Sequence, residues 1–479
     1  MGDSYRAKEG EVPPRDSALF DGETLRLRGV RGETLGVQVV LKGREQHPVS
    51  LELPADVCSV EGFRVRSLEV REPSTSMYGP SHGTGRYPDV LVPTKGPVPA
   101  LERAFFDVAI REKAPAGRFD GRITIGPRSF PVRLRVDPIS IHPELNPLVW
   151  VFYHPKEIAR LHHVADDDGP QQIAIENKYH ELFRRHGAYL ATDLGPERFA
   201  PRRRFMHDVR YWPVSVDLSS DEKTAADVRR WLSLFAGSTV QPFTIPVDEP
   251  KSEAQKRRAS HIADVIGQAG GGAPRLLRAV TDAVSPIYGN LMEAFFSPKN
   301  IPASAAYPHK KGQLFFTYNG RPPEAGSMIL DTDGTALRTW GWIAYRYGVE
   351  LWYAWEGLYF SDRYNGGGPT DVFQQAVTFD ERRKGGEDFG NGDGVLAYPG
   401  PLPSLRLKAL RRGLQDRLLL LELERCGGGQ EARAIAEKIV PRALGEADSM
   451  PSWPTDEPSW EVARERLLDQ IAWRCHVDS

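Results

Sequence analysis

Two adjacent acidic residues, Asp248 and Glu249, are the strongest candidates for chemistry in this sequence of 479 residues. They follow a short apolar run, Thr244 to Val247, and precede Pro250. The β-branched residues of the run predict a short buried strand, and a helical pattern begins soon after the proline. The carboxyl end of a strand that leads into a helix is where α/β barrels carry their catalytic groups. The other interpretation, in which Asp248 caps a turn and Glu249 is solvated, has equal weight on these residues alone.

Neighbouring carboxyl groups suit hydrolysis of a glycosidic bond, a reaction that usually needs two of them. Because consecutive Cα atoms are ~3.8 Å apart, Asp248 and Glu249 would act on one sugar from the same strand end. This arrangement fits a substrate-assisted reaction on a 2-acetamido sugar, in which the acetamide oxygen attacks the anomeric carbon. One acid then protonates the leaving oxygen, and a second carboxylate steadies the acetamide N–H and the developing charge.

Aromatic residues around the last predicted strand are candidates for sugar binding, because sugar C–H faces pack on aromatic rings while Tyr and Trp keep a polar group. Along a strand, Tyr353 and Trp355 face one side and Trp352 the other, so some of them belong to the core. Tyr318 ends the preceding predicted strand, and Glu356 is either a third carboxylate at the site or a solvated loop residue. Three further residues end predicted strands and are interpreted as ordinary hydrogen-bonded residues: His154, Asp193 and Asp282.

These residues need a scaffold that brings strand ends together. From about residue 24 to 137, period-two alternation with frequent turns predicts an antiparallel β-sandwich. Beyond residue 143, apolar runs alternate with helical segments about eight times, which predicts a (β/α)8 TIM-type barrel. The predicted barrel strands are 148–154, 188–192, 214–217, 244–248, 275–282, 293–296, 313–318 and 349–355. Ser404 is placed to cap the first of several C-terminal helices.

We therefore expect a multidomain chain: a sandwich over residues 1–142, a catalytic barrel over 143–402 and C-terminal helices packed on the barrel over 403–479. The net charge of −2 gives no reason to expect nucleic acid or an anionic membrane as a partner. No apolar run is long enough to span a bilayer. The first fifteen residues lack the apolar core of a signal peptide, and since a signal can have been removed, the compartment stays open.

Cofactor and metal motifs are not found in the sequence. It has no HExxH motif, P-loop, GxSxG motif or GxGxxG following a strand, so we expect neither a cofactor nor a metal. The three cysteines, Cys58, Cys426 and Cys475, show no metal-ligand spacing and are interpreted as buried or incidental thiols.

Several short motifs in a shared order carry a family resemblance. They are Arg31-Gly32-Glu33-Thr34, Gln38 to Leu41, Tyr87-Pro88-Asp89 to Pro93, Pro115 to Gly121, Asp248-Glu249-Pro250, Asp331, Arg338, Trp340 or Trp342, Gly348 to Trp355, Gly392-Asp393-Gly394, Tyr398-Pro399-Gly400, and Ser404-Leu405-Arg406 with Arg411, Gly413 and Asp416. With these motifs the chain resembles the glycoside hydrolase family 123-like proteins over most of its length.

The resemblance implies a retaining, substrate-assisted β-N-acetylgalactosaminidase with a sandwich packed against its barrel. It makes Glu249 the general acid and Asp248 the residue that holds the acetamide. Together with the residue arguments above, it yields a set of substrate-binding candidates: Tyr318, Trp352, Tyr353, Trp355, Glu356, Asp331 and Arg338. The expected partner is a glycan or glycoconjugate, and the oligomeric state is not indicated.

The chain departs from the family pattern at one motif, where Gly348-Val349-Glu350-Leu351-Trp352 replaces the frequent Gly-Leu-Leu-Tyr-Trp. This departure leaves the identity of the sugar open. Two alternatives also stay open, the first motivated by Glu356 and the second by the sandwich and the aromatic cluster. One is a glycoside hydrolase of the same fold that acts on a different glycan without acetamide participation. The other is a non-catalytic carbohydrate-binding protein, since a fold does not by itself fix a function.

Overall fold

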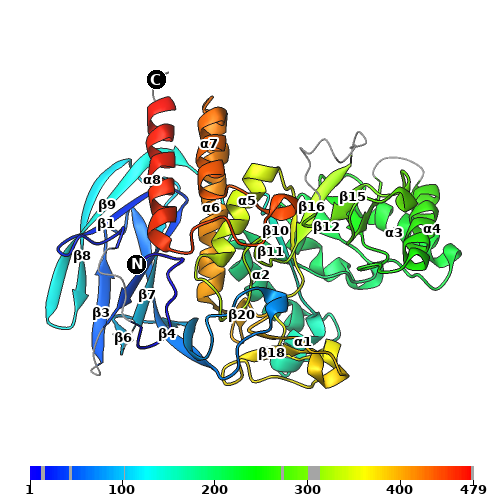
Figure 1. Cartoon of the computed structure of the whole chain (residues 1–479), viewed down its shortest axis with the longest axis horizontal. Coiled ribbons are helices and arrows are strands. Elements are labelled where there is room, and N and C mark those ends of the chain that lie inside the picture. Colours follow the sequence, from blue (N-terminus) through cyan, green and yellow to red (C-terminus); the bar gives the residue numbers. More distant parts are fainter. Residues whose placement is uncertain (12–16, 42–45, 102, 271–274, 300–312, 476–479) are drawn as a thin grey trace.

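The computed structural model describes residues 1–11, 17–41, 46–101, 103–270, 275–299 and 313–475. Figure 1 shows three parts side by side, with a pair of β-sheets at the left and a body of strands and helices at the right. Between them stand three C-terminal helices: α6 (Leu405–Arg425), α7 (Gly429–Ile439) and α8 (Glu457–Arg474).

The N-terminal part is a sandwich of two sheets, as the alternating pattern predicts. One sheet has the order β1-β9-β8-β3-β6 and the other the order β2-β7-β4-β5. The strands are β1 (Leu25–Arg31), β2 (Thr34–Val40), β3 (His47–Glu52), β4 (Cys58–Val70), β5 (Gly85–Thr94), β6 (Val98–Ala100), β7 (Arg103–Ile110), β8 (Gly117–Ile125) and β9 (Arg128–Ser140). We expected a purely antiparallel sandwich, but the β1–β9 ladder is parallel.

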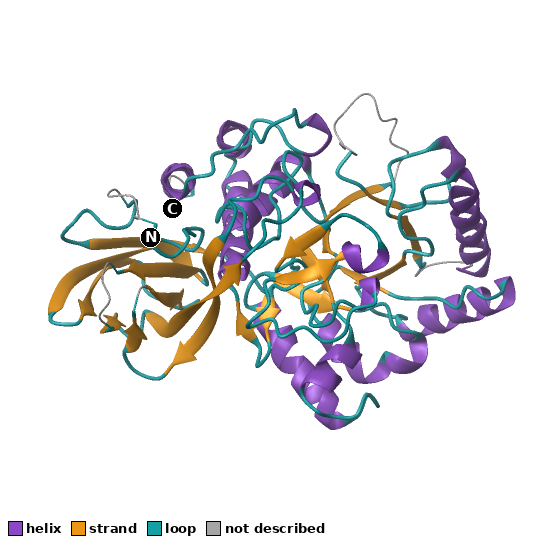
Figure 2. Ribbon diagram, turned by 60° about the horizontal axis from the view of Figure 1, so that its bottom comes forward, coloured by secondary structure: helices purple, strands orange, loops and turns teal. Residues whose placement is uncertain are grey.

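The larger body is a nearly closed barrel of eight parallel strands in the order β11-β10-β17-β16-β15-β14-β13-β12. Figure 2 shows helices covering the outside of these strands. The strands are β10 (Val149–Phe152), β11 (Ala188–Ala191), β12 (Tyr211–Pro213), β13 (Gln241–Thr244), β14 (Leu277–Val280), β15 (Ala294–Phe296), β16 (Leu314–Tyr318) and β17 (Trp352–Ala354).

Two barrel strands differ from their predicted positions. The third was expected over 214–217 but lies at Tyr211–Pro213, just before the alternating residues that suggested it. The fourth ends at Thr244 and does not reach Asp248. The physical reason is that Pro246 has no N–H to donate to a ladder, so the chain leaves the sheet before the acidic pair.

In the described residues, which leave out 300–312 between β15 and β16, the helices of the barrel are fewer than the regular alternation predicts. They are α1 (Pro155–Leu161), α2 (Pro170–Arg184), α3 (Asp221–Leu234), α4 (Glu253–Gly270) and α5 (Thr339–Tyr347). Two 3-10 helices over 196–198 and 200–206 connect β11 to β12, and one over 286–288 connects β14 to β15. The eight parallel strands are therefore confirmed, while the strand–helix alternation is incomplete.

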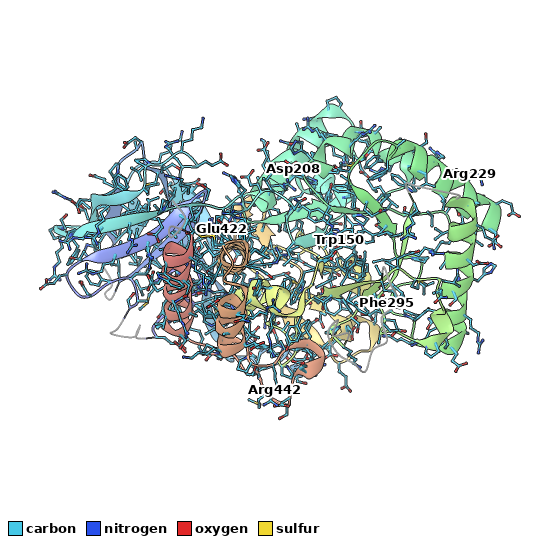
Figure 3. The ribbon with its side chains drawn as sticks, turned by 90° about the horizontal axis from the view of Figure 1, so that it is seen from above. Trp150, Asp208, Arg229, Phe295, Glu422 and Arg442 are labelled. Atoms are coloured by element: carbon cyan, nitrogen blue, oxygen red, sulfur yellow. A yellow bond between two sulfur atoms is a disulfide. The ribbon has the colours of Figure 1, made fainter. Side chains whose placement is uncertain are left out.

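Aromatic rings fill the barrel interior. Trp150 stacks on Tyr353 with ring centroids 4.1 Å apart and meets Phe243 edge-on at 5.3 Å. Phe296 and Phe316 meet at 5.0 Å. These residues come from five strands, and Figure 3 places Trp150 within the barrel. The barrel is thus a packed core that supports the groups at its rim.

Helix α6 joins the sandwich to the barrel through buried ion pairs. Arg406 donates to Asp89 at 2.8 Å, and Arg411 donates to Asp107 at 2.6 Å. Ser404 caps the helix by accepting the Leu407 N–H, as predicted. On the other side of the helix, Asp416 accepts from Arg338 at 2.8 Å. Since breaking one partner of a buried pair leaves an uncompensated charge, these contacts fix α6 between the two bodies. Many of the motif residues that carry the family resemblance lie at this junction.

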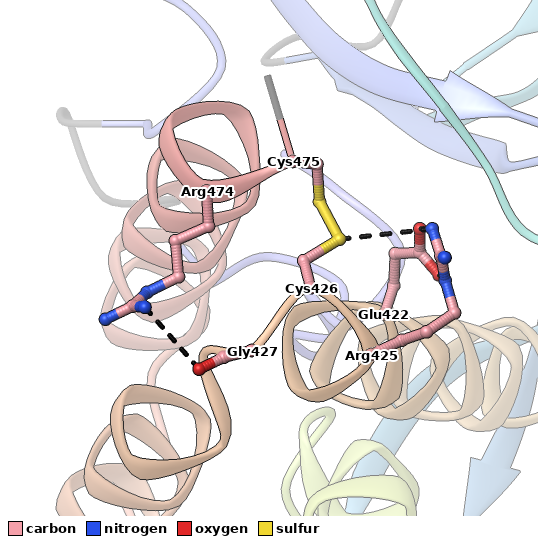
Figure 4. The surroundings of a disulfide bond; sticks show 6 residues. All are labelled: Glu422, Arg425, Cys426, Gly427, Arg474 and Cys475. Atoms are coloured by element: carbon pink, nitrogen blue, oxygen red, sulfur yellow. Dashed lines mark hydrogen bonds and ion pairs between the residues drawn. A yellow bond between two sulfur atoms is a disulfide. The ribbon is translucent and has the colours of Figure 1, made fainter. Parts of the chain in front are cut away.

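A disulfide closes the ends of two C-terminal helices (Figure 4). Cys426 follows α6, Cys475 follows α8, and their sulfur atoms are bonded across a separation of 49 residues. Beside the bond, Arg474 donates to the Gly427 carbonyl at 3.4 Å. The prediction of incidental thiols is therefore wrong for these two residues and holds for Cys58, which is buried and free. The spacing carries no sign of the pairing, because it depends on how α6 and α8 pack.

The structure also bears on the limits of the three parts. The last sandwich strand ends at Ser140, the first barrel strand begins at Val149, and α6 begins at Leu405. The domain boundaries at 142/143 and 402/403 stay a prediction, since the shared ion pairs connect all three parts. In the described residues, no helix combines the length and apolarity needed to cross a membrane.

Candidate active site

The acidic pair lies on the loop that follows β13. Both side chains, Asp248 and Glu249, are exposed to solvent, while Pro246 and Pro250 on either side are buried. Glu249 has a φ of 40°, in the left-handed region that non-glycine residues rarely adopt. Such a conformation persists only where surrounding contacts impose it, and it is frequent at functional sites.

A single hydroxyl, that of Thr281, holds both members of the pair. Thr281 directly follows β14, the strand beside β13. It accepts the backbone N–H of Glu249 at 2.5 Å and donates its own proton to Oδ1 of Asp248 at 2.7 Å. One donor and one acceptor function of the hydroxyl are thereby used, which fixes the Asp248 carboxylate and the turn at Glu249 together.

Tyr318, at the end of β16, also reaches the acidic pair. Its hydroxyl donates to Oε1 of Glu249 at 3.1 Å. Burial raises the pKa of Tyr318, and the charges of Glu249, Asp248 and Asp282 raise it further. The phenol therefore keeps its proton at neutral pH and remains a hydrogen-bond donor.

Two neighbouring residues of β17, Trp352 and Tyr353, face opposite sides of the strand, as its alternation predicts. Tyr353 faces the barrel interior, where burial and then the charges of Asp248, Glu356 and Asp193 raise its pKa well above the usual value. Trp352 faces outward, is fully buried, and stacks on Trp340 at 4.7 Å. The structure thus puts Tyr353 in the barrel interior, against Trp150, and Trp352 in the layer between strands and helices.

Glu356 is buried, which contradicts the interpretation of a solvated loop residue. Its carboxylate pairs with Arg363, and its Oε1 lies 3.6 Å from Nε2 of His154. Burial raises the pKa of Glu356 to about 8, although Arg363 acts against the shift. Burial and the charge of Arg363 lower the pKa of His154 to about 4, so the imidazole is neutral at pH 7. Oε2 of Glu356 has no hydrogen-bond partner in the described chain.

Trp355 is half-buried beside this cluster. Its indole N–H donates to Asp393 at 3.0 Å, and its backbone N–H donates to the Asn319 side chain at 2.9 Å. The ring lies 5.9 Å from the ring of Tyr364, which is 43% exposed. Tyr364 in turn contacts His154 at 3.3 Å. An aromatic surface therefore continues from the barrel mouth toward solvent.

Asp331 and Arg338 have other surroundings. Asp331 is buried and accepts the backbone N–H and the hydroxyl of Ser74 at 2.8 and 2.6 Å. Arg338 is buried and donates to Asp416 at 2.8 Å and to Glu461 at 2.6 Å. These partners belong to the segments that join the parts of the molecule, and the structure does not bring either residue into contact with Asp248 or Glu249.

Sequence reasoning missed Thr281 and gave Asp193 a minor part. Asp193 follows β11, and part of its side chain is accessible to solvent. The protein atoms packed around its carboxyl group partly desolvate it and raise its pKa to about 6, and the charge of Asp248 adds to the shift. Its place after a predicted strand was the available signal. Thr281 offers none, because a threonine at a strand end has no distinctive spacing.

One group of described residues brings possible metal-ligand atoms together. The group with ligand atoms close together is Glu422 with Cys426 and Cys475. The two sulfur atoms are joined in the disulfide, so neither is available as a thiolate.

Comparison with known proteins identifies the architecture. No model of a protein family matches the sequence, and no curated protein matches it significantly. A solved structure does: a family 123 glycoside hydrolase from Clostridium perfringens, described for glycolipid glycan hydrolysis, aligns over 94% of this chain and 93% of its own with a TM-score of 0.68 and 12% identity. The chain has the fold of a family 123 glycoside hydrolase. At this identity the likeness concerns the fold, and it confirms the resemblance seen in the sequence motifs at that level.

A second solved structure is much less similar. A family 39 glycoside hydrolase from the gut symbiont Bacteroides cellulosilyticus WH2 aligns over 82% of both chains with 9% identity and a TM-score of 0.33, which is too low to carry an argument. The family 123 match covers the sandwich, the barrel and the C-terminal helices together, and it therefore supports the whole arrangement.

Proposed function

We propose that this protein is a retaining glycoside hydrolase that cleaves β-linked 2-acetamido sugars, N-acetyl-β-galactosaminides first. The observation that carries the proposal is the hydrogen-bonded unit in which Thr281 ties Asp248 to the backbone of Glu249. Two carboxyl groups are thereby held side by side at the carboxyl ends of the barrel strands. The likeness to a family 123 glycoside hydrolase supports the same chemistry by analogy of fold.

In the proposed reaction the sugar supplies its own nucleophile. The acetamide oxygen attacks the anomeric carbon while Glu249 gives its proton to the leaving oxygen, and the glycosidic bond breaks. Asp248 accepts the acetamide N–H through Oδ2, since Oδ1 already accepts from Thr281. Its negative charge stabilises the positive charge of the cyclic oxazolinium that forms. Glu249, now ionised, takes a proton from a water molecule that attacks the anomeric carbon and opens the oxazolinium ring. The anomeric configuration is inverted twice and is therefore retained in the product.

The remaining candidates would bind the sugar. Tyr353 and Trp355 come from β17 or its end, and Tyr364 offers an exposed aromatic face for the aglycone side. Glu356 would accept hydrogen bonds from sugar hydroxyls through its unpartnered Oε2. Trp352, Asp331 and Arg338 would act on the site only through the residues that they support.

Hydrolysis of an aryl N-acetyl-β-galactosaminide tests the proposal. We expect turnover with retained configuration in the first product, observed by proton NMR. Glu249→Gln should lose roughly 10²–10⁴-fold in kcat/KM, the usual contribution of a general acid. The loss should be smaller with a dinitrophenyl leaving group, which departs without protonation. Glu253→Gln, an exposed glutamate at the start of α4, is the matched control.

Other outcomes separate the alternatives. Equal rates for Glu249→Gln and the parent would show that Glu249 is not the acid. A second candidate function, hydrolysis of a glycan without an acetamide, is favoured by the buried third carboxyl of Glu356 beside His154. Turnover of other aryl glycosides, with no inhibition by the thiazoline of N-acetylgalactosamine, would support it. Binding of oligosaccharides without cleavage of any would favour a carbohydrate-binding protein.

A further inference from the structure

A groove of about 1050 Å³ lies between the five-stranded sheet and α8, lined by none of the candidate active-site residues. Its walls come from β1, β8 and β9 on one side and from α8 on the other. Figure 1 shows α8 alongside these strands at the left of the molecule. Arginines make up much of the charged lining: Arg26, Arg28, Arg118, Arg133, Arg135 and Arg466.

The sheet register puts several of these arginines directly beside one another. Arg28 of β1 pairs with Arg135 of β9, and Arg135 pairs with Arg118 of β8, so one row across three strands carries three positive charges. In the next row Arg26 pairs with Arg133. Like charges on directly opposed positions destabilise a sheet. Ion pairs with Asp137, Glu465 and Asp469 account for Arg28, whereas Arg118 has no such pair in the described residues.

Donors in the groove remain without partners. Within the described residues, no hydrogen bond or ion pair joins Arg118 or Arg133 to another side chain. Arg28 is more informative, because its side chain is only 10% exposed and its Nη2 has no partner. Its Nε bonds to Asp137 and its Nη1 to Glu465 and Asp469. A buried donor without a partner in a charged groove indicates a ligand that supplies an acceptor.

Acidic residues balance part of this charge. Three carboxylates, Asp137, Glu465 and Asp469, pair with Arg28 and Arg135, and their number equals that of the arginines in the row. In the next row Arg26 pairs with Asp21, and Asp120 of β8 stands opposite Arg133. The carboxylates of the first row lie at its α8 end, so the positive charge without an acidic partner in the described residues lies at Arg118 and at Arg466 of α8.

We propose that this groove binds an anionic glycan chain through its sulfate or carboxylate groups. The planar guanidinium fork matches such oxyanions, and several forks in register can contact successive groups of an extended chain. Positions two residues apart on a strand are about 6.6 Å apart, and neighbouring strands are about 4.8 Å apart, which gives a grid of donors. The choice of a glycan over another polyanion rests on the proposed function. The sandwich would then hold an acidic polymer or glycoconjugate while the barrel cleaves it.

Binding to the intact protein tests the inference, with fluorescein-labelled heparin and chondroitin sulfate oligosaccharides as probes and their desulfated forms and hyaluronan oligosaccharides for comparison. The variant is Arg118→Ala with Arg133→Ala, two exposed residues of the groove. The matched control is Arg122→Ala with Arg128→Ala, exposed on the same two strands and outside the groove. We expect salt-dependent binding of a sulfated or uronate-containing probe, weakened at least about tenfold in the groove variant by loss of two charge-assisted contacts. The control should bind like the parent.

Three results would overturn the inference: no binding of any anionic oligosaccharide, equal binding by the groove variant, or equal affinity for duplex DNA of the same charge. Turnover of a small aryl glycoside, measured on the same samples, keeps the two proposals apart. Absent binding with intact turnover refutes the groove alone. Binding without turnover refutes the catalytic proposal alone.

Discussion

The hydroxyl of Thr281 donates a hydrogen bond to Oδ1 of Asp248 across 2.7 Å. The Thr281 hydroxyl oxygen also accepts the backbone N–H of Glu249, so one side chain from the neighbouring strand fixes the Asp248 carboxylate and the turn at Glu249. In the proposed reaction Asp248 must present its second oxygen to the substrate acetamide. Thr281 would thus be a positioning residue, and its contribution can be measured separately from that of the acids.

Replacement of Thr281 should lower activity according to the loss of its hydroxyl. Thr281→Val keeps the shape and removes the bond to a charged acceptor, which is worth about 1.5–3 kcal/mol, or roughly 10–150-fold in kcat/KM. Thr281→Ser keeps the hydroxyl and should restore most of the activity. Steady-state kinetics on an aryl N-acetyl-β-galactosaminide checks this. Equal activity of the Val and Ser variants would contradict the positioning role.

Removal of the Tyr318 hydroxyl should lower activity, because Glu249 loses a hydrogen-bond donor at 3.1 Å. A hydrogen bond to a charged group is worth about 1.5–3 kcal/mol, so we expect Tyr318→Phe to lose roughly 10–150-fold in kcat/KM on an aryl N-acetyl-β-galactosaminide. Tyr288→Phe, which removes a hydroxyl bonded to Asp282, is the comparison. Equal activity of Tyr318→Phe and the parent would argue against a role for this bond in the reaction.

Asp193 should make stability depend on pH in a direction opposite to that of most carboxylates. Its folded-state pKa of about 6 lies above the ordinary value of 3.8, so the folded protein binds the proton more tightly than the unfolded chain. Stability therefore falls as pH rises from about 4 to 6. Asp193→Asn should unfold at a higher temperature than the parent at pH 7 and at nearly the same temperature at pH 4.

Asp217 should make stability change with pH in the direction opposite to that at Asp193. Hydrogen bonds from the side chain and backbone of Ser219 lower the pKa of this exposed carboxylate. The charged form is favoured in the folded state, so Asp217→Asn should lower stability at pH 7 and lose this effect as pH falls. Thermal unfolding of both variants at several pH values tests the pair. If both variants changed the unfolding temperature at pH 7 in the same direction, the opposite pKa shifts of Asp193 and Asp217 would be contradicted.

Arg338 should matter for stability more than for catalysis. It is fully buried and bonded to Asp416 and Glu461. Arg338→Ala removes one positive charge from this buried network, in which Glu461 keeps Arg412 and Asp416 keeps Arg464, and should cost about 3–5 kcal/mol of unfolding free energy. The folded fraction should keep a kcat close to that of the parent. Urea unfolding and kinetics measure both, with the exposed Arg203→Ala as control. A stable variant with a greatly raised KM would restore Arg338 as a substrate-binding residue.

Much of the fold could be predicted because local patterns decide it. In β9, Val132, Leu134 and Val136 are buried and Arg133 and Arg135 are exposed, which is the period-two alternation of a half-buried strand. The barrel strands are short apolar runs buried on both faces, and seven of the eight overlap their predicted ranges. The third was misplaced because Val214-Ser215-Val216 alternates as a strand would, although the ladder ends at Pro213.

The sequence by itself determined the alternation of the sandwich, the eight parallel strands and the position of the acidic pair at a barrel rim, because periodicity and turn residues act over a few neighbours. Tertiary structure decided the rest. The bonds of Thr281 and Tyr318 to the pair, the burial of Glu356, the disulfide between Cys426 and Cys475, and the row of Arg28, Arg135 and Arg118 each join residues far apart in the chain. Such contacts depend on strand register and helix packing, which no local pattern encodes.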